Sequence, residues 1–381
     1  MERQKHKIAV VIPQYGRIGG AENVAFQLCE KLAEIPEFDI HVFARKQDAS
    51  PSRITFHRIP MIHFPRWLQP ISFAAFAKRK MATLSFDIVH SHERIFDMDI
   101  MTFHGIPHDV WIRNMRKKSL SGFDQATCWV EQKGILNPSL KMILPVSTLV
   151  KNELLAIYPI PESRISVMHP GVDIARFSRP DAEFHRQRIR TRYGMAASDI
   201  VMLFVGMNFE IKRLDLVIRG IAGVSAAKRS NIKLLILGKG SPAPYQKMAS
   251  ELGVGDRIIF AGVVNDIESW YSAGDMFVMP SVMDTFGLVV LEAMASRLPV
   301  IISPTVGAAD LVTHGVNGIV LPDHPSASDM TTAINCLLAI NTRRNMGENA
   351  HKTALDHDWN RVSAKLANVY LHIINARRHA S

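Results

Sequence analysis

The chain has 381 residues, of which 47% are hydrophobic and 21% charged, and its formal net charge is +10. This composition excludes a fibrous or low-complexity protein and predicts two globular domains. No apolar run is long enough to cross a bilayer, and the apolar part of the N-terminal segment is too short for a signal peptide. The three cysteines, Cys29, Cys128 and Cys336, match no disulfide or metal spacing, which predicts a reducing, cytoplasmic location.

Short apolar runs alternate with amphipathic stretches along the chain. The runs expected to form strands are residues 7–13, 39–44, 86–92, 142–147, 200–206, 233–238, 257–262, 276–281 and 299–304. Helical spacing of apolar residues separates them, for example over 21–34, 214–228 and 242–253. This alternation predicts an α/β fold of parallel sheets covered on both faces, in two doubly wound domains.

A stretch rich in Pro, Gly and then charge joins the two sets of strands. We therefore expect a first domain over residues 1–178 and a second over 179–356. The remaining residues, 357–381, have a helical pattern. We expect this C-terminal helix to pack back toward the first domain.

The segment "PSVMDTFGLVVLEAMASRLPVI", residues 280–301, places two acids around a helix that begins with glycine. Ligands of doubly wound sheets bind at such strand-to-helix turns. The amides of Gly287 and Leu288 would hold a diphosphate, helped by the helix dipole. Asp284 and Glu292 would then accept hydrogen bonds from two sugars, Glu292 from a ribose. Alternatively, Asp284 is an ordinary acid near a helix N-terminus and Glu292 a solvated helix residue.

A second loop, in "FVGMNFEIKRLDLVIRG", carries Lys212 between an expected strand and an expected helix. A lysine at the carboxyl edge of the same sheet can neutralise a leaving diphosphate. A lysine that only covers the protein surface is the alternative.

These two segments resemble the E-x7-E segment and the lysine-bearing phosphate loop of family 4 retaining glycosyltransferases. The Gly-rich turn "GGAENVAFQLCEKLAE", the histidine of "FHG" and the segment "GAADLVTHGVNGIVLP" resemble further parts of that family, in the same order. The resemblance implies the GT-B fold, in which two Rossmann-like domains face a central cleft.

The resemblance also implies roles for single residues. Lys212 would bind the donor diphosphate, Asp284 the transferred sugar, and His104 the sugar near the reacting carbon, so these three are the candidate catalytic residues. The candidate donor-binding residues are Gly19, Gly20, Gly206, Lys212, Arg213, Val263, Val264, Asp284, Phe286, Gly287, Leu288 and Glu292. The sequence departs from the family pattern in three ways: Asp284 stands where Glu is usual, Met207 stands where many members have Arg, and Ile211 and Arg213 flank Lys212 in place of the common Arg-Lys-Gly.

Retaining members of this fold need no metal and no cofactor, so the nucleotide sugar is expected to be a substrate and no metal site is expected. Two patterns could suggest a metal: Asp97 to Asp99, "DMD", and the histidines of "HSHE" at 90–93. The first copies the metal-binding Asp-x-Asp of a different glycosyltransferase fold, but it lies in the first domain and not after a strand of the donor domain. No carboxylate or cysteine completes a recognisable ligand spacing with the histidines, so a polar acceptor-site lining or hydrogen-bonded histidines are favoured. Glu22 could cap a helix or bind the acceptor.

Aromatic and basic residues mix in two stretches of the first domain, 63–84 and 109–123. We expect either stretch to lie at an anionic membrane surface. In the second, the residues expected to contact that surface or the acceptor are Trp111, Arg113, Arg116, Lys117 and Lys118. Part of the apolar material is alternatively core.

The expected function is therefore a retaining glycosyltransferase, a hexosyltransferase that moves a sugar from a nucleotide sugar, in particular a UDP-sugar, to a glycan or lipid-linked acceptor. Within the family, the resemblance is to bacterial lipopolysaccharide core and other envelope glycosyltransferases, which implies a peripheral position on the inner face of the cytoplasmic membrane. The alternatives are a GT-B sugar-nucleotide epimerase and a non-catalytic nucleotide-sugar-binding scaffold. Nucleic-acid binding through the basic residues would leave Asp284 and Glu292 unexplained, and no nucleic-acid partner is expected.

Overall fold

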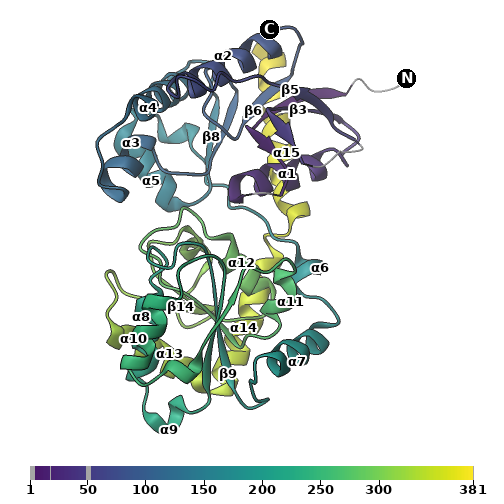
Figure 1. Cartoon of the computed structure of the whole chain (residues 1–381). Helices are drawn as coiled ribbons and strands as arrows, with labels where there is room; N and C mark the ends of the chain where they lie inside the picture. Colours follow the sequence, from purple (N-terminus) through teal and green to yellow (C-terminus); the bar gives the residue numbers. More distant parts are fainter. Residues whose placement is uncertain (1–4, 18, 49–52, 381) are drawn as a thin grey trace. The chain divides into compact units, whose positions relative to one another are not determined.

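A computed structural model describes residues 5–17, 19–48 and 53–380, and the chain divides into two compact units (Figure 1). Unit 1 consists of Met1–Gly171 and Trp359–Ser381, and unit 2 of Val172–Asp358. The boundaries therefore lie at 171/172 and 358/359, a few residues away from those expected at 178/179 and 356/357. Unit 2 is one continuous segment, whereas unit 1 takes its last helix from the C-terminal end of the described chain.

Unit 1 contains a six-stranded parallel sheet in the order β5-β3-β1-β6-β7-β8. The strands, together with a separate two-stranded pair β2 and β4, are β1 (His6–Val11), β2 (Gln14–Tyr15), β3 (Phe38–Ala44), β4 (Lys46–Gln47), β5 (Thr55–Arg58), β6 (Ile88–Ser91), β7 (Ile100–Phe103) and β8 (Met142–Pro145). The order runs outward from β1 in one direction and outward from β6 in the other. The switch point of this doubly wound sheet is therefore between β1 and β6, where ligands of such sheets bind.

The helices of unit 1 follow the strands and are α1 (Gly20–Leu32), α2 (Leu68–Met81), α3 (His108–Val110), α4 (Gly122–Ile135), α5 (Thr148–Ile157) and α15 (Trp359–Ala380). Helix α15 packs against α1. The hydroxyl of its Tyr370 lies 2.6 Å from Nδ1 of the fully buried His90 in β6. Its Arg377 donates to the Asp87 carbonyl (2.7 Å) and to the Asp99 carboxylate. The last helix thus satisfies buried polar groups of the first sheet.

Unit 2 repeats the same topology, with the strand order β11-β10-β9-β12-β13-β14. The strands are β9 (Ile200–Val205), β10 (Ile232–Leu237), β11 (Ile258–Gly262), β12 (Met276–Met279), β13 (Val300–Ile302) and β14 (Gly318–Val320). All of them pair in parallel. The switch point of this second sheet lies between β9 and β12, whose following loops carry the residues that the motifs single out.

Helices cover the second sheet and are α6 (Ile174–Phe177), α7 (Ala182–Arg192), α8 (Leu214–Gly223), α9 (Ala226–Arg229), α10 (Ala243–Glu251), α11 (Ile267–Tyr271), α12 (Leu288–Ala295), α13 (Ala327–Leu338) and α14 (Ile340–Leu355). Helices α8 and α13 approach each other closely at Gly220, where a Cβ atom would lie 2.2 Å from Cγ of Met330. The core on this side of the sheet is built from the side chains of β9 and β10, such as Phe204 and Leu234, both fully buried.

The doubly wound α/β architecture expected from the sequence is confirmed. All nine apolar runs form strands, and three further strands, β5, β7 and β14, complete the sheets. None of the described helices is long and apolar enough to cross a membrane.

Candidate functional site

Two candidate residues that are far apart in sequence meet at the switch point of the second sheet. Lys212 lies in the loop after β9 and Asp284 in the loop after β12, the strand beside it. The Lys212 ammonium and the Asp284 carboxylate form an ion pair in which the side chains are only 14% and 21% exposed. The stem of Lys212 runs over Gly206, where a Cβ atom would lie 3.2 Å from Cγ of the lysine. Because Gly206 has no side chain, the side chain of Lys212 has room to reach the carboxyl edge of the sheet, where ligands of such sheets bind.

Backbone hydrogen bonds hold Asp284 in place. Its amide donates to the Thr305 carbonyl (3.1 Å), and its carbonyl accepts from the Gly307 amide (2.9 Å). The Phe286 amide donates to its Oδ1 (3.1 Å), while Oδ2 faces Lys212. One carboxylate oxygen therefore fixes the loop and the other takes part in the ion pair, so the acid is oriented before any ligand binds.

Helix α12 begins at the same turn. Gly287, the residue before it, has φ +84°, and a Cβ atom there would lie 2.8 Å from Cε of Met279. Both the backbone conformation and the space require glycine. No side chain caps the first turn, and no acid lies in it. The N-terminus of α12 therefore presents its positive dipole end beside the Lys212–Asp284 pair, as a diphosphate site requires.

Glu292 lies on the second turn of α12 and is bound by a tyrosine. The Tyr271 hydroxyl is 2.8 Å from its Oε2 and 3.1 Å from the Val289 carbonyl. Burial raises the pKa of Glu292, while the hydrogen bond from Tyr271 and the charge of Arg176 oppose that rise. Glu292 is therefore a partly buried, hydrogen-bonded carboxylate and not a freely solvated helix residue. Tyr271 was not predicted, because nothing in the motif around Glu292 points to a partner 21 positions earlier.

The other donor candidates of unit 2 lie around this edge of the sheet, but they differ in exposure and in the partners that they contact. Val263 and Val264 follow β11, and Val263 is 71% exposed. The ring of Phe286 is buried, so this residue anchors the turn. Leu288 is the first residue of α12. Arg213 pairs with Asp215 (3.5 Å). It lines a small pocket of about 200 Å³ that includes neither Lys212 nor Asp284, so the structure does not bring Arg213 to the ion pair.

In unit 1, the candidate histidine lies beside two others at the carboxyl end of the sheet. Nε2 of His104 is 2.9 Å from Nδ1 of His92, and the His92 ring lies against the ring of His90. Burial lowers the pKa of His104 to about 4 and that of His90 to about 3. His90 is satisfied by Tyr370 and by Thr102 (2.8 Å). His104 is therefore neutral at physiological pH and can act as a hydrogen-bonding group.

Gly19 and Gly20 begin α1 at the same edge of the first sheet. Gly19 is the N-cap residue of α1 and lacks a side chain that could cap the helix. A Cβ atom on Gly19 would lie 2.5 Å from Oε2 of Glu22, so the carboxylate of the first turn folds back over this glycine. This position favours the capping role for Glu22, since an acid in the first turn interacts well with the helix dipole.

A pocket of about 230 Å³ opens in unit 1 beside the ends of β1 and β6. Pro13, Glu93, Arg94 and His108 line it, together with residues of α2 and α4. Arg94 donates to the fully buried Glu131 (2.6 Å), which also accepts from the Tyr158 hydroxyl (2.7 Å) and the His108 amide (3.1 Å). This network was not predicted from the sequence. Its one available signal was that Glu93 and Arg94 directly follow two histidines at a strand end.

The two patterns that could suggest a metal have structural partners. Asp97 accepts from Asn137 (2.6 Å) and pairs with Lys78 (2.7 Å), while Asp99 accepts from the Val89 amide (2.8 Å) and pairs with Arg377. Within the described parts of the chain, no group of three His, Cys, Asp or Glu residues could hold a metal ion.

The basic aromatic segment after His108 forms a single turn with π-helical hydrogen bonding, Trp111–Met115, in which the Arg116 amide donates to the Trp111 carbonyl (3.0 Å). Trp111 is 37% exposed. Arg113 pairs with Asp109 (2.5 Å), and Arg116, Lys117 and Lys118 are exposed. The turn therefore displays one large aromatic ring next to several cations, with Ile112 as its buried anchor.

Two family models match the chain and together cover most of it. Residues 18–176 match Glycosyltransferase Family 4, and residues 185–353 match Glycosyl transferases group 1. The chain belongs to the group 1 glycosyltransferases of family 4. A relative of this family, an uncharacterized glycosyltransferase of Methanocaldococcus jannaschii, is 30% identical over 60% of this chain and 59% of its own length. The chain thus spans between half and two thirds of the length of the first relatives that it matches.

Solved structures of other proteins show the same fold. WaaG, a glycosyltransferase involved in lipopolysaccharide biosynthesis, superposes with a TM-score of 0.78 at 19% identity, covering 95% of this chain and 99% of its own. Anabaena HepE in complex with UDP-glucose gives a TM-score of 0.72 at 16% identity, covering 95% and 98%. The GT-B fold expected from the sequence is confirmed, and the family membership indicated by the motifs is also confirmed.

Proposed function

We propose that this glycosyltransferase moves a hexose from a UDP-sugar, with retention of configuration, to a glycan or lipid-linked acceptor of the bacterial cell envelope. The observation that carries the proposal is the junction of Lys212, Asp284 and the uncapped N-terminus of α12 at the switch point of the second sheet. This arrangement suits a sugar diphosphate. The cation and the helix amides supply positive charge for the diphosphate, and the oriented acid accepts hydrogen bonds from the hydroxyls of the sugar.

The chemistry follows from these groups. Lys212 and the amides of α12 stabilise the negative charge that grows on the leaving diphosphate, because fixed dipoles in a protein site need little reorganisation. Oδ2 of Asp284 is directed to the same place, where it accepts from a hydroxyl of the transferred sugar. Glu292, held by Tyr271, accepts from the ribose. The leaving phosphate helps to deprotonate the acceptor hydroxyl on the same face of the sugar, and no metal or cofactor takes part.

Three features support the donor and the acceptor class. Anabaena HepE, which shares the fold, binds UDP-glucose, and WaaG acts in lipopolysaccharide biosynthesis. The unit 1 pocket beside Arg94 offers about 230 Å³ for part of an acceptor. The turn at Trp111, with Arg113, Arg116, Lys117 and Lys118, suits an anionic surface such as the inner face of the cytoplasmic membrane.

Calorimetric titration with UDP, GDP and ADP, in the absence of added metal, tests the donor site. We expect UDP to bind most tightly. Glu292→Ala should weaken UDP binding about tenfold or more if two hydrogen bonds to the ribose are lost. An unchanged dissociation constant would remove the ribose role from Glu292, and binding of no nucleotide would favour a non-catalytic scaffold.

Transfer itself is tested with UDP-glucose, UDP-galactose and lipopolysaccharide core fragments as acceptors, followed by NMR of the anomeric proton in the product. An α-linked product from an α-linked donor is expected. Conversion of one UDP-sugar into its epimer, without transfer to any acceptor, would instead identify an epimerase.

A further inference from the structure

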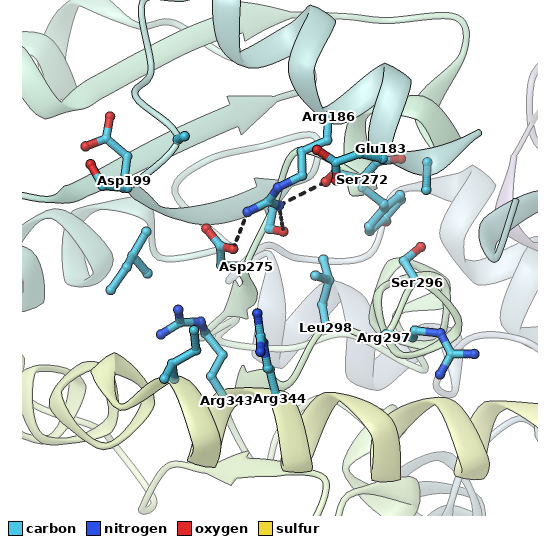
Figure 2. Close-up of a pocket in the computed structure, with 17 residues that line it drawn as sticks. Glu183, Arg186, Asp199, Ser272, Asp275, Ser296, Arg297, Leu298, Arg343 and Arg344 are labelled. Atoms are coloured by element: carbon cyan, nitrogen blue, oxygen red, sulfur yellow. Dashed lines mark hydrogen bonds and ion pairs between the residues drawn. The ribbon is translucent and has the colours of Figure 1, made fainter. Parts of the chain in front are cut away.

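A second pocket of unit 2 lies at the amino-terminal edge of its sheet, at the opposite ends of the strands from the donor site. It has a volume of about 560 Å³. The start of β9 and the residues that precede β12 and β13 contribute to its wall, with α7 above and the first turn of α14 below (Figure 2). We propose that this pocket binds a phosphate monoester carried on a small polyhydroxy molecule, such as a sugar phosphate.

Part of the charge in the pocket is structural. Asp275 accepts from Arg186 through Oδ1 (2.7 Å) and from Arg190 through Oδ2 (2.6 Å), and the Val201 amide also donates to Oδ2 (2.7 Å). Arg186 donates further to the carbonyls of Ser272 and Gly274. Both carboxylate oxygens of Asp275 therefore accept hydrogen bonds from arginines of α7, and these bonds attach α7 to the sheet.

Of the other cations that line the pocket, Arg297 pairs with Glu348, which leaves Arg343 and Arg344. Arg343 and Arg344 rise from α14 toward Asp275 and Arg186, as Figure 2 shows. Arg343 donates from Nη1 to the carbonyls of Leu337 and Leu338, at 2.8 and 3.0 Å. No carboxylate in the described residues pairs with Arg343 or Arg344. Burial is the main cause that lowers the pKa of Arg343; the charge of Asp275 opposes this shift, and the charges of Arg186 and Arg344 add to it.

The start of α14 adds to this positive charge. The helix has 16 residues, its N-cap residue Ala339 offers no side chain to the first amides, and no acid lies in the first turn. Arg343 and Arg344 are instead close to the positive end of the dipole, an arrangement that is unfavourable unless an anion is present. A phosphate dianion accepts bidentate hydrogen bonds from arginine and from free helix amides.

The rest of the pocket decides the ligand class. Its volume is too large for a phosphate alone, and Glu183, Ser198 and Asp199 also line it. Oδ2 of Asp199 accepts from the Ala196 amide (2.8 Å), and Oε1 of Glu183 accepts from Gln187 (3.0 Å), so each acid has a second oxygen for a ligand hydroxyl. Hydroxyl acceptors opposite an arginine pair fit a phosphorylated sugar better than a fully anionic or an apolar ligand.

Calorimetry with glucose 6-phosphate, inorganic phosphate and glucose tests the proposal on the full chain. Phosphate probes could also enter the donor site, so the titration is repeated in Lys212→Ala. We expect glucose 6-phosphate to bind wild type and Lys212→Ala alike, more tightly than inorganic phosphate, and glucose not to bind. Arg344→Glu should weaken the binding about tenfold or more, because a charge-assisted hydrogen bond becomes a repulsion. Arg219→Glu, an equally exposed helix arginine on α8, is the matched control and should bind normally.

Arg344 is exposed, and within the described parts of the chain no hydrogen bond or ion pair is recorded for its side chain, so a normal melting temperature for Arg344→Glu is expected and would show that the variant folds. Loss of binding in Lys212→Ala with normal binding in Arg344→Glu would place the phosphate in the donor site and overturn the proposal. Absence of binding to wild type at millimolar glucose 6-phosphate would overturn it too. Equal affinity for inorganic phosphate would refute the polyhydroxy part of the ligand.

Discussion

Replacing Asp284 with asparagine separates the two halves of the donor site. Asparagine keeps the shape of the side chain. Its Oδ1 can still accept the hydrogen bond that the Phe286 amide donates to Oδ1 of Asp284 (3.1 Å). The change removes the negative charge that faces Lys212 in an ion pair buried to about four fifths or more. The lysine is then free for the diphosphate, whereas the sugar loses its charged hydroxyl acceptor.

The size of both effects follows from the charge-assisted hydrogen bonds involved, each of which contributes about 1.5–3 kcal/mol, equivalent to roughly 10- to 150-fold in affinity. In the substituted protein, UDP should therefore bind as tightly as in wild type or up to about tenfold more tightly, since Lys212 no longer has to leave a carboxylate. UDP-glucose should lose its advantage over UDP, and the rate of sugar transfer should fall by about a hundredfold.

Calorimetric titration of wild type, Asp284→Asn and Lys212→Met with UDP and UDP-glucose distinguishes these effects, with Arg219→Ala as a control on α8. Lys212→Met should weaken both ligands by at least about tenfold. If Asp284→Asn weakened UDP as much as Lys212→Met does, the acid would be supporting the phosphate site, and the division of roles between the two residues would be refuted.

Four further predictions concern buried or closely packed residues. Glu292→Gln should weaken UDP binding. The melting temperature of the variant, measured relative to that of the wild type, should be higher at pH 8 than at pH 4.5. Because the pKa of Glu292 is raised in the folded protein, the wild type loses stability as the pH rises above the pKa of this residue in the unfolded chain. Glutamine does not titrate, so the variant should lack this loss, and melting curves at several pH values would show the difference. His90 and His104, with pKa values near 3 and 4, should each make the stability of unit 1 fall by about 1.4 kcal/mol per pH unit below pH 6.5, because the unfolded chain takes up their protons first; a flat acid limb in denaturant titrations would contradict this. Tyr370→Phe should cost about 1–3 kcal/mol in denaturant unfolding, since His90 loses a buried partner, and an unchanged midpoint would show that the bond is dispensable. Gly287→Ala should reduce UDP affinity and lower the melting temperature, because φ is +84° and Met279 fills the space, whereas normal UDP binding by this variant would exclude the close approach of the diphosphate.

Most of the fold could be predicted because each buried parallel strand is a continuous apolar run. Three strands of the two sheets were missed. β5 (Thr55–Arg58) is polar and lies on an edge, and β14 (Gly318–Val320) begins with a glycine, whereas β7 (Ile100–Phe103) is as long and as buried as the predicted β12 and carried the same apolar signal. The unit boundary at Gly171 was missed by a few residues, because the composition changes gradually over the charged stretch that follows.

The site could be predicted only where its residues lie in a local pattern. Lys212 and Asp284 each follow a strand, and the adjacency of those strands brings them together. Tyr271, by contrast, reaches Glu292 from another helix, and Arg94 reaches Glu131 from 37 positions away, so no spacing rule predicts either pair. The arginines of the second pocket come from separate segments and, taken singly, look like solvated surface residues.

The position of α15 has a consequence for the order in which the protein is made. Unit 2 is a single insertion, and the two chain segments that enter and leave it are joined by a hydrogen bond from the Val172 amide to the His357 carbonyl (2.8 Å). During synthesis from the N-terminus, unit 2 is complete before Tyr370 and Arg377 leave the ribosome. Until then His90 has no Tyr370 beside it, and α1 has no α15 to cover it. The first half of the chain to be translated is therefore the last to finish folding, and a released chain truncated after residue 358 should contain a native second unit beside an unfinished first one.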